Sequence, residues 1–133
     1  MITRRFFVDC ALCAAAGFIA ADASAQTVQT PGLNRTILSQ IDGPTDGLIT
    51  VMAKVEIERG AIIARHTHPG VESGYVIDGG LTLDVQGQPV KAFRAGDSFQ
   101  IPTGVPHSGA CNEKSTLIAI YVVEKGKPLA SPA

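Results

Sequence analysis

The sequence has no tryptophan, few other aromatic residues and no excess of either charge. Aromatic residues make up 5% of the chain, and 11 Lys and Arg residues face 12 Asp and Glu residues, for a net charge of −1. The basic residues are also scattered, so the chain lacks the basic patch that binds nucleic acid or an anionic membrane surface. We therefore expect no nucleic acid partner, and a small-molecule ligand or substrate instead.

Long hydrophobic runs are also absent. The weakly apolar stretch over residues 10–21 is too short to span a bilayer, which takes about 20 residues, so we expect no stable membrane insertion. This stretch follows Arg4 and Arg5 in a twin-arginine pattern, and residues 23–25 form a small-residue cleavage site. These features predict a cleavable signal peptide over residues 1–25 and a periplasmic or secreted protein. An amphipathic N-terminal helix is the alternative.

Cysteine is scarce. Cleavage after residue 25 would remove two of the three cysteines, Cys10 and Cys13. The remaining Cys111 cannot form a disulfide within the chain. Cys111 is either a small buried apolar residue or a sulfur close to a metal site.

The part of the chain after the signal predicts strands and no long amphipathic helix. Short runs rich in Val, Ile and Thr are interrupted by 14 Gly and 8 Pro residues, which is typical of an all-β chain. Apolar and polar residues alternate over residues 49–57. Further strands are expected over residues 72–77, 81–85 and 97–101, in a run ending near Phe93, and over residues 116–123.

The strand over residues 116–123 is apolar on both faces, and such strands are usually buried on both sides. A small barrel covers only its inner face, so another segment or subunit should cover the outer one. Residues 33–41 are the candidate cover, within one chain or by exchange between two. The same two-sided pattern predicts a homodimer.

Four metal-ligand side chains come from two separate segments. His66 and His68 are two residues apart on one predicted strand, so both imidazoles point to the same face of that strand. Glu72 follows a short turn. His107 follows a loop rich in Pro and Gly that can direct it inward. A single such histidine is often a hydrogen-bonded core residue, but three with a carboxylate indicate a metal site.

The chemistry of this ligand set points to one divalent metal ion, with Fe, Mn, Ni, Co and Zn as candidates. Imidazole suits Zn, Fe and Ni, and a carboxylate favours Fe, Mn, Ni or Co. Four protein ligands fill a tetrahedral ion but leave two positions of an octahedral ion open for substrate, water or dioxygen. Ile62 and Ala64 have the same parity as the two histidines, which predicts one continuous interior stripe.

These segments resemble the two sequence motifs of the cupin superfamily. The first motif is formed by Gly60, His66, His68, Glu72 and Gly79, and the second by Gly96, Pro102, Gly104 and His107. The family pattern has Asn four residues after the second-motif histidine. Cys111 stands at that position here, so Asn112 is not carried over as a site residue.

The resemblance implies an all-β fold, a small antiparallel β-barrel of the double-stranded β-helix or jelly-roll type. It also implies His66, His68, Glu72 and His107 as the four metal ligands. The chain then divides into a signal peptide (1–25), an N-terminal segment that packs on or swaps between subunits (26–47), the barrel (48–125) and a C-terminal tail (126–133).

The activities that the resemblance implies are those of dioxygenases, isomerases, decarboxylases and non-catalytic binders. We expect a metal-dependent, dioxygenase-like enzyme that acts on a small organic molecule. The alternatives are a non-catalytic binder of a metal or small metabolite, and an isomerase or decarboxylase. Glu72 either remains a ligand or acts as general base.

Other polar candidates are few: Arg65, Tyr75, Gln100 and Ser108. Arg65 has the opposite strand parity to His66, and Tyr75 the opposite parity to Glu72, so both are expected to face away from the site. The loop before His107 prevents a parity argument for Gln100.

Overall fold

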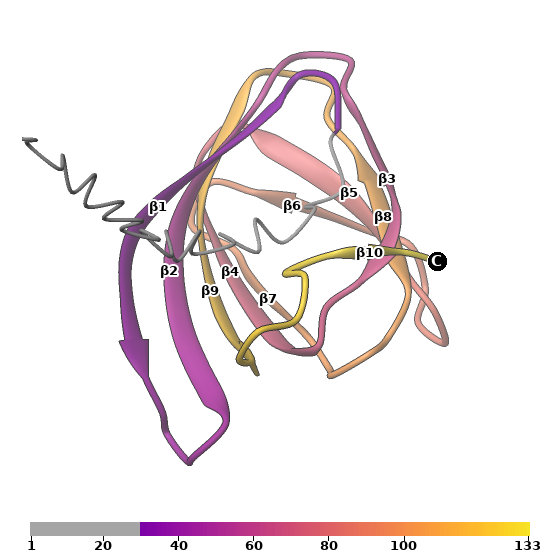
Figure 1. Ribbon diagram of the computed structural model, residues 1–133. Helices are drawn as coiled ribbons and strands as arrows, with labels where there is room; N and C mark the ends of the chain where they lie inside the picture. Colours follow the sequence, from indigo (N-terminus) through magenta and orange to yellow (C-terminus); the bar gives the residue numbers. More distant parts are fainter. Residues whose placement is uncertain (1–29) are drawn as a thin grey trace, which may run out of the picture.

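The computed structural model describes residues 30–133, which form ten β-strands and no helix (Figure 1). The strands are β1 (Leu33–Asp42), β2 (Leu48–Ile57), β3 (Ile62–Thr67), β4 (Gly70–Asp78), β5 (Gly80–Val85), β6 (Lys91–Arg94), β7 (Ser98–Ile101), β8 (His107–Ala110), β9 (Ser115–Glu124) and β10 (Ser131–Pro132). The expected all-β fold is confirmed. The predicted signal peptide lies outside the described residues, and none of the residues 30–133 belongs to a helix long and apolar enough to cross a membrane.

Two five-stranded sheets form the walls of a jelly-roll barrel. One sheet has the order β1-β2-β9-β4-β7 and the other the order β10-β3-β8-β5-β6, and all strand pairs are antiparallel. The two sheets enclose the interior seen in Figure 1. Residues of both sheets that point into this interior form one hydrophobic core.

The alternation predicted for residues 49–57 is present in β2, where Val51, Ala53, Val55 and Ile57 are buried. β9 lies between β2 and β4, and its inward residues are equally buried. Its outward residues, Ile118, Ile120 and Val122, are only half-buried. The two-sided apolar character of this strand is therefore real, but its outer face is not covered within residues 30–133.

The prediction that residues 33–41 cover this outer face is wrong within the chain. β1 instead pairs with β2 at the edge of the sheet, in register from Leu33 opposite Ile57 to Asp42 opposite Ile49. Pairing with β2 satisfies the backbone amide and carbonyl groups on one side of β1, which packing across the sheet would leave unpaired. The far end of the β1–β2 hairpin projects beyond the barrel in Figure 1, and Ile41 is 70% exposed.

The prediction that Ile62 and Ala64 share the interior face of His66 is also wrong. Ile62 is 66% exposed and Ala64 is exposed, whereas Ile63 is buried. The register between β3 and β8 shifts between Ile63 and His66, so β3 has one extra residue there. This β-bulge reverses the parity of the strand before it reaches the histidines.

The C-terminal tail contains a short strand that the sequence did not predict. β10 pairs with β3 and places Ser131 opposite Thr67 and Pro132 opposite His66. Ala130, just before β10, is buried. The tail therefore lies along the strand that contributes two of the predicted ligands.

Candidate metal centre

The four predicted ligand residues meet inside the barrel. His66 lies on β3 and His68 directly after its end, His107 begins β8, and Glu72 lies on β4. His66 and His107 are direct cross-strand partners. The ligand atoms of the three histidines all lie within 4.8 Å of one another, and all four side chains are buried.

Glu72 completes the cluster from the opposite sheet. Its Oε2 lies 3.0 Å from Nε2 of His68 and 3.3 Å from Nε2 of His107. The sequence motif therefore predicted a set of residues that the fold brings together, although they come from three strands in two sheets.

Backbone carbonyls fix the orientation of all three imidazoles. Nδ1 of His66 lies 2.7 Å from the Ala64 oxygen, Nδ1 of His68 2.6 Å from the Leu129 oxygen, and Nδ1 of His107 2.9 Å from the Val105 oxygen. A carbonyl can only accept a hydrogen bond, so each Nδ1 carries the proton. In the neutral ring, each Nε2 then offers a lone pair to the centre of the cluster.

This arrangement fits a bound cation. Within residues 30–133, Nε2 of His68 and Nε2 of His107 are buried without a hydrogen-bond partner, and both face the Glu72 carboxylate. Lone pairs at this distance repel one another unless a positive charge lies between them. A divalent metal held by the three Nε2 atoms and the Glu72 carboxylate would provide that charge.

Burial disfavours the other source of positive charge, a protonated imidazole. It lowers the pKa of His66 to about 4, an effect that the Ala64 carbonyl opposes and the nearby His107 and His68 reinforce. For Glu72, burial alone raises the pKa. The proximity of the His107 and His68 rings outweighs burial and holds the pKa of Glu72 below its ordinary value. At neutral pH, the His66 ring is therefore neutral and the Glu72 carboxyl is an anion.

A small cavity adjoins the cluster. Its walls are formed by Leu33, Arg35, Val55, Ile57, Ile63, His66, Glu72, Leu81, Leu83, Phe99, His107, Leu117 and Tyr121. The free space is about 40 Å³, and a single water needs roughly 10–15 Å³ by the same measure. The cavity is thus mostly apolar and suits a ligand of few atoms.

Gly74 shapes one wall of this cavity. A Cβ at residue 74 would collide with the ring of Phe99, its cross-strand neighbour on β7. The absence of a side chain at Gly74 therefore lets Phe99 lie flat against β4 and line the cavity.

Arg35 and Tyr121 line the cavity, and the sequence did not indicate either of them. Tyr121 is buried opposite Glu72 on the neighbouring strand, and its ring centroid lies 5.0 Å from that of His68. Burial, with a further contribution from Glu72, raises the pKa of Tyr121, so its hydroxyl stays protonated. Tyr121 was counted only as one of the apolar residues of the strand predicted over residues 116–123. For Arg35, the available signal was its position two residues after the apolar Leu33 in the segment over residues 33–41.

The polar candidates named from the sequence do not line the cavity. Arg65 bonds Gln86 through Nη2 at 3.1 Å on the exterior, and Tyr75 is 51% exposed. Gln100 is also exposed, and its Nε2 donates to Ser73. Ser108 is half-buried on β8, opposite Asp84. The parity arguments for Arg65 and Tyr75 are confirmed.

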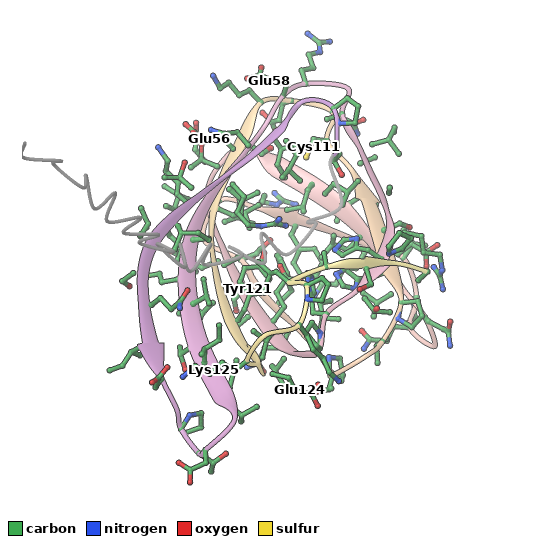
Figure 2. The ribbon with its side chains drawn as sticks, in the orientation of Figure 1. Glu56, Glu58, Cys111, Tyr121, Glu124 and Lys125 are labelled. Carbon is green, nitrogen blue, oxygen red and sulfur yellow. The ribbon has the colours of Figure 1, made fainter. Side chains whose placement is uncertain are left out.

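Cys111 packs in the hydrophobic core and is 1% exposed. Burial raises the pKa of its thiol, and its sulfur does not belong to the group of converging ligand atoms. Figure 2 shows Cys111 near one end of the barrel and Tyr121 closer to the middle. Cys111 is thus a small buried apolar residue, and the adjacent Asn112 is exposed.

Comparisons with known proteins agree with this architecture. The cupin domain family matches residues 53–123. An RmlC-like cupin from Shewanella frigidimarina is 28% identical, with a TM-score of 0.59, over 76% of this chain and 87% of its own. No curated protein matches the sequence.

Two enzymes share the fold at lower identity. The DMSP lyase DddQ from Ruegeria pomeroyi is 19% identical, with a TM-score of 0.63, over 76% of this chain and 51% of its own. A salicylate 1,2-dioxygenase from Pseudaminobacter salicylatoxidans is 20% identical, with a TM-score of 0.58, over 71% of this chain and 27% of its own. This chain therefore spans only about half of the lyase and a quarter of the dioxygenase.

Proposed function

Because the chain belongs to the cupin domain family, we propose that it is a metal-dependent, dioxygenase-like enzyme that acts on a small organic molecule. The observation that supports this best is the convergence of three buried imidazoles and a carboxylate at the wall of an apolar cavity. His66, His68 and His107 would hold the metal through Nε2, and Glu72 through its carboxylate. Fe, Mn, Ni, Co and Zn all suit these donors.

The metal, when bound, supplies a Lewis acid beside the cavity and, if it is Fe or Mn, redox chemistry with dioxygen. The residues of the chain have distinct tasks around it. The carbonyls at Ala64, Leu129 and Val105 keep the imidazoles in one tautomer. Glu72 is a ligand or accepts a proton, since its carboxyl is ionised. The protonated Tyr121 hydroxyl can donate a hydrogen bond, and the apolar walls exclude water.

Elemental analysis of the natively produced protein, followed by oxygen uptake with small phenolics and diketones, tests this proposal. A dioxygenase-like enzyme retains a metal and consumes oxygen with at least one substrate. Turnover without oxygen uptake would instead indicate an isomerase, lyase or decarboxylase. A metal or metabolite retained without any turnover would indicate a non-catalytic binder.

The cluster also predicts a loss of stability in acid. Because burial depresses the pKa of His66 from 6.5 to about 4, the unfolded chain takes up this proton at a higher pH than the folded one. The contribution of His66 to stability is therefore complete above about pH 6.5 and is lost as the pH falls towards 4. Protons also compete with the metal for the imidazoles.

Melting temperatures of metal-loaded and metal-free protein, measured between about pH 8 and pH 4, check this prediction. Both forms should be less stable towards the acid end, and the advantage of the loaded form should shrink as its metal is released. A metal still bound at about pH 4, with an undiminished stability advantage, would argue against ligation by three histidines.

We also propose that the protein is a homodimer that associates through the outer face of the β1-β2-β9-β4-β7 sheet. The apolar residues on this face, here called the outer apolar patch, are Met52, Val71, Tyr75, Ile118, Ile120 and Val122. They lie on the three neighbouring strands β2, β9 and β4. Met52, Val71 and Tyr75 are exposed at 38%, 38% and 51%. Contiguous exposed apolar surface of this kind is a frequent site of association.

Ile120 lies near the centre of the outer apolar patch, opposite Met52 on one side and Ser73 on the other. Ile120→Lys should shift the protein towards the monomer at micromolar concentration, because association would bury an unpaired charge. Gln88→Lys adds the same charge in an exposed turn and should leave the mass unchanged. Light scattering measures the molar mass of both variants and of the unmodified protein. A monomeric mass for the unmodified protein would rule the dimer out.

The location of the protein is proposed from its sequence alone. The twin-arginine pattern and small-residue cleavage site support export and cleavage after residue 25. Sequencing the N-terminus of protein from the periplasm should give Gln26 as the first residue. An intact Met1 in cytoplasmic protein would contradict export.

A further inference from the structure

Arg35 is the one basic side chain among the residues that line the cavity, apart from the histidines of the cluster. It lies on the inner face of β1, opposite Val55. Ala53 and Ala119 form the next cross-strand pair, between the Val55 and Tyr121 positions. These small side chains leave room for Arg35 to extend across the sheet, and its Cζ lies 5.6 Å from the centroid of the Tyr121 ring.

The charge of Arg35 is not balanced by a carboxylate in residues 30–133. None of the ion pairs formed in this range includes Arg35, and its Nε is buried without a hydrogen-bond partner there. Glu72 is the nearest candidate inside the cavity, but its carboxylate faces His68 and His107. The Tyr121 side chain offers Arg35 a cation–π contact, and its protonated, uncharged hydroxyl does not neutralise the charge of Arg35. Arg35 is half-buried, and a partly desolvated guanidinium group without a carboxylate partner favours the binding of an anion.

We propose that Arg35 binds the carboxylate of a small organic acid, whose other end reaches the histidine cluster. The second half of this proposal rests on the proposed function. A guanidinium group presents parallel N–H donors that match the two oxygens of a carboxylate. One Arg carries one positive charge, which balances a carboxylate but not a phosphate dianion. The cavity walls beside Arg35, including Leu33, Val55 and Leu117, suit an apolar body of few atoms.

Calorimetric titration with acids and their uncharged amides tests the proposal. The probes are glycolate, pyruvate and butyrate, each compared with its amide, and inorganic phosphate as a different anion. Unmodified protein should prefer at least one acid over its amide by about 10- to 100-fold, the range expected for a charge-assisted hydrogen bond. Arg35→Gln should abolish this preference, and Arg35→Lys should restore part of it because Lys keeps the charge.

Two measurements separate this proposal from the proposed function. Metal content should be the same in Arg35→Gln and unmodified protein, because the ion pairs of the four predicted ligand residues do not include Arg35. The titrations are run on both Co²⁺-loaded and metal-stripped protein. If the protein prefers acids over amides but retains no metal, the result would support carboxylate binding by Arg35 and reject the proposed metal-dependent enzyme. Arg65→Gln, which removes an exterior guanidinium group, is the matched control and should keep the preference.

Three results would overturn the role of Arg35. They are equal affinity for acids and amides, an acid preference that survives in Arg35→Gln, and no binding of any of the three acids at millimolar concentration. Stronger binding of inorganic phosphate than of every acid would also reject a carboxylate ligand. Circular dichroism of each variant confirms that the barrel is folded before its affinities are compared.

Discussion

His66→Ala is expected to abolish metal retention while leaving a folded barrel. The substitution removes one of three converging Nε2 atoms, and the hydrophobic core of the two sheets does not depend on it. Loss of a residue that only supports a ligand typically weakens metal affinity by about 10- to 100-fold, so loss of the ligand itself should cost at least about 100-fold. The metal content is measured by elemental analysis after the protein is loaded with metal and the excess is removed by dialysis. The metal affinity is measured by competition with a chelator.

The same variant should lose the stability that the metal contributes. A metal at about 1,000 times its Kd stabilises the native state by about 4 kcal/mol, and each kcal/mol shifts the midpoint of a domain of this size by about 4–8 °C. Metal should therefore raise the melting temperature of unmodified protein strongly and that of His66→Ala very little. Arg65→Ala, one residue away on the exterior, should behave like unmodified protein. An unchanged metal content in His66→Ala would refute the assignment of this ligand.

Removing residues 128–133 is expected to lower metal affinity by about 10- to 100-fold, although none of these residues is a predicted ligand. The deletion removes the Leu129 carbonyl, which accepts the hydrogen bond from Nδ1 of His68 at 2.6 Å. His68 then loses the contact that fixes its tautomer and orients Nε2 towards the centre. Competition with a chelator measures the affinity of the shortened chain.

A second, shorter deletion distinguishes the carbonyl from the strand beside it. Removing residues 131–133 deletes β10 but keeps Leu129 and the buried Ala130. If the hydrogen bond is the cause, this shorter deletion should retain most of the affinity that the longer one loses. Equal losses in both would assign the effect to β10, and no loss in either would show that His68 needs no support from the tail.

The sequence predicted most of the strands, because these had a clear alternation or a clear turn beside them, but it did not predict the short strands β8 and β10. β2 shows the alternation of Val51, Ala53, Val55 and Ile57 that its residues suggested. The convergence of the four predicted ligand residues was also predictable, because the spacing of the motif reflects a geometry that the barrel imposes. The side of a strand could be inferred wherever the pairing continued without interruption.

The failures occurred where the pairing changes. The bulge between Ile63 and His66 has no distinct signature in the residues around it, so parity counted back from the histidines gave the wrong face to Ile62 and Ala64. The position of β1 was missed for a related reason. An apolar strand fits either across a sheet or along its edge, and only the hydrogen bonds to β2 decide between them.

Arg35 and Tyr121 were missed because their chemistry depends on neighbours distant in the sequence. Tyr121 is close to Glu72 only through the pairing of β4 with β9. Arg35 lies close to the ring of Tyr121 only through the pairing of β1 with β2 and of β2 with β9. No local pattern marks either residue, whereas the ligands carried their own motif.

The bond between His68 and the Leu129 carbonyl has a consequence for protein synthesis. The two residues are 61 positions apart in the chain, and at about 5–20 residues per second the ribosome takes roughly 3–12 s to proceed from one to the other. During that interval His68 is already synthesised, but the carbonyl that accepts its hydrogen bond is not. A metal site that depends on the Leu129 carbonyl would therefore be complete only after residue 129 has left the ribosome.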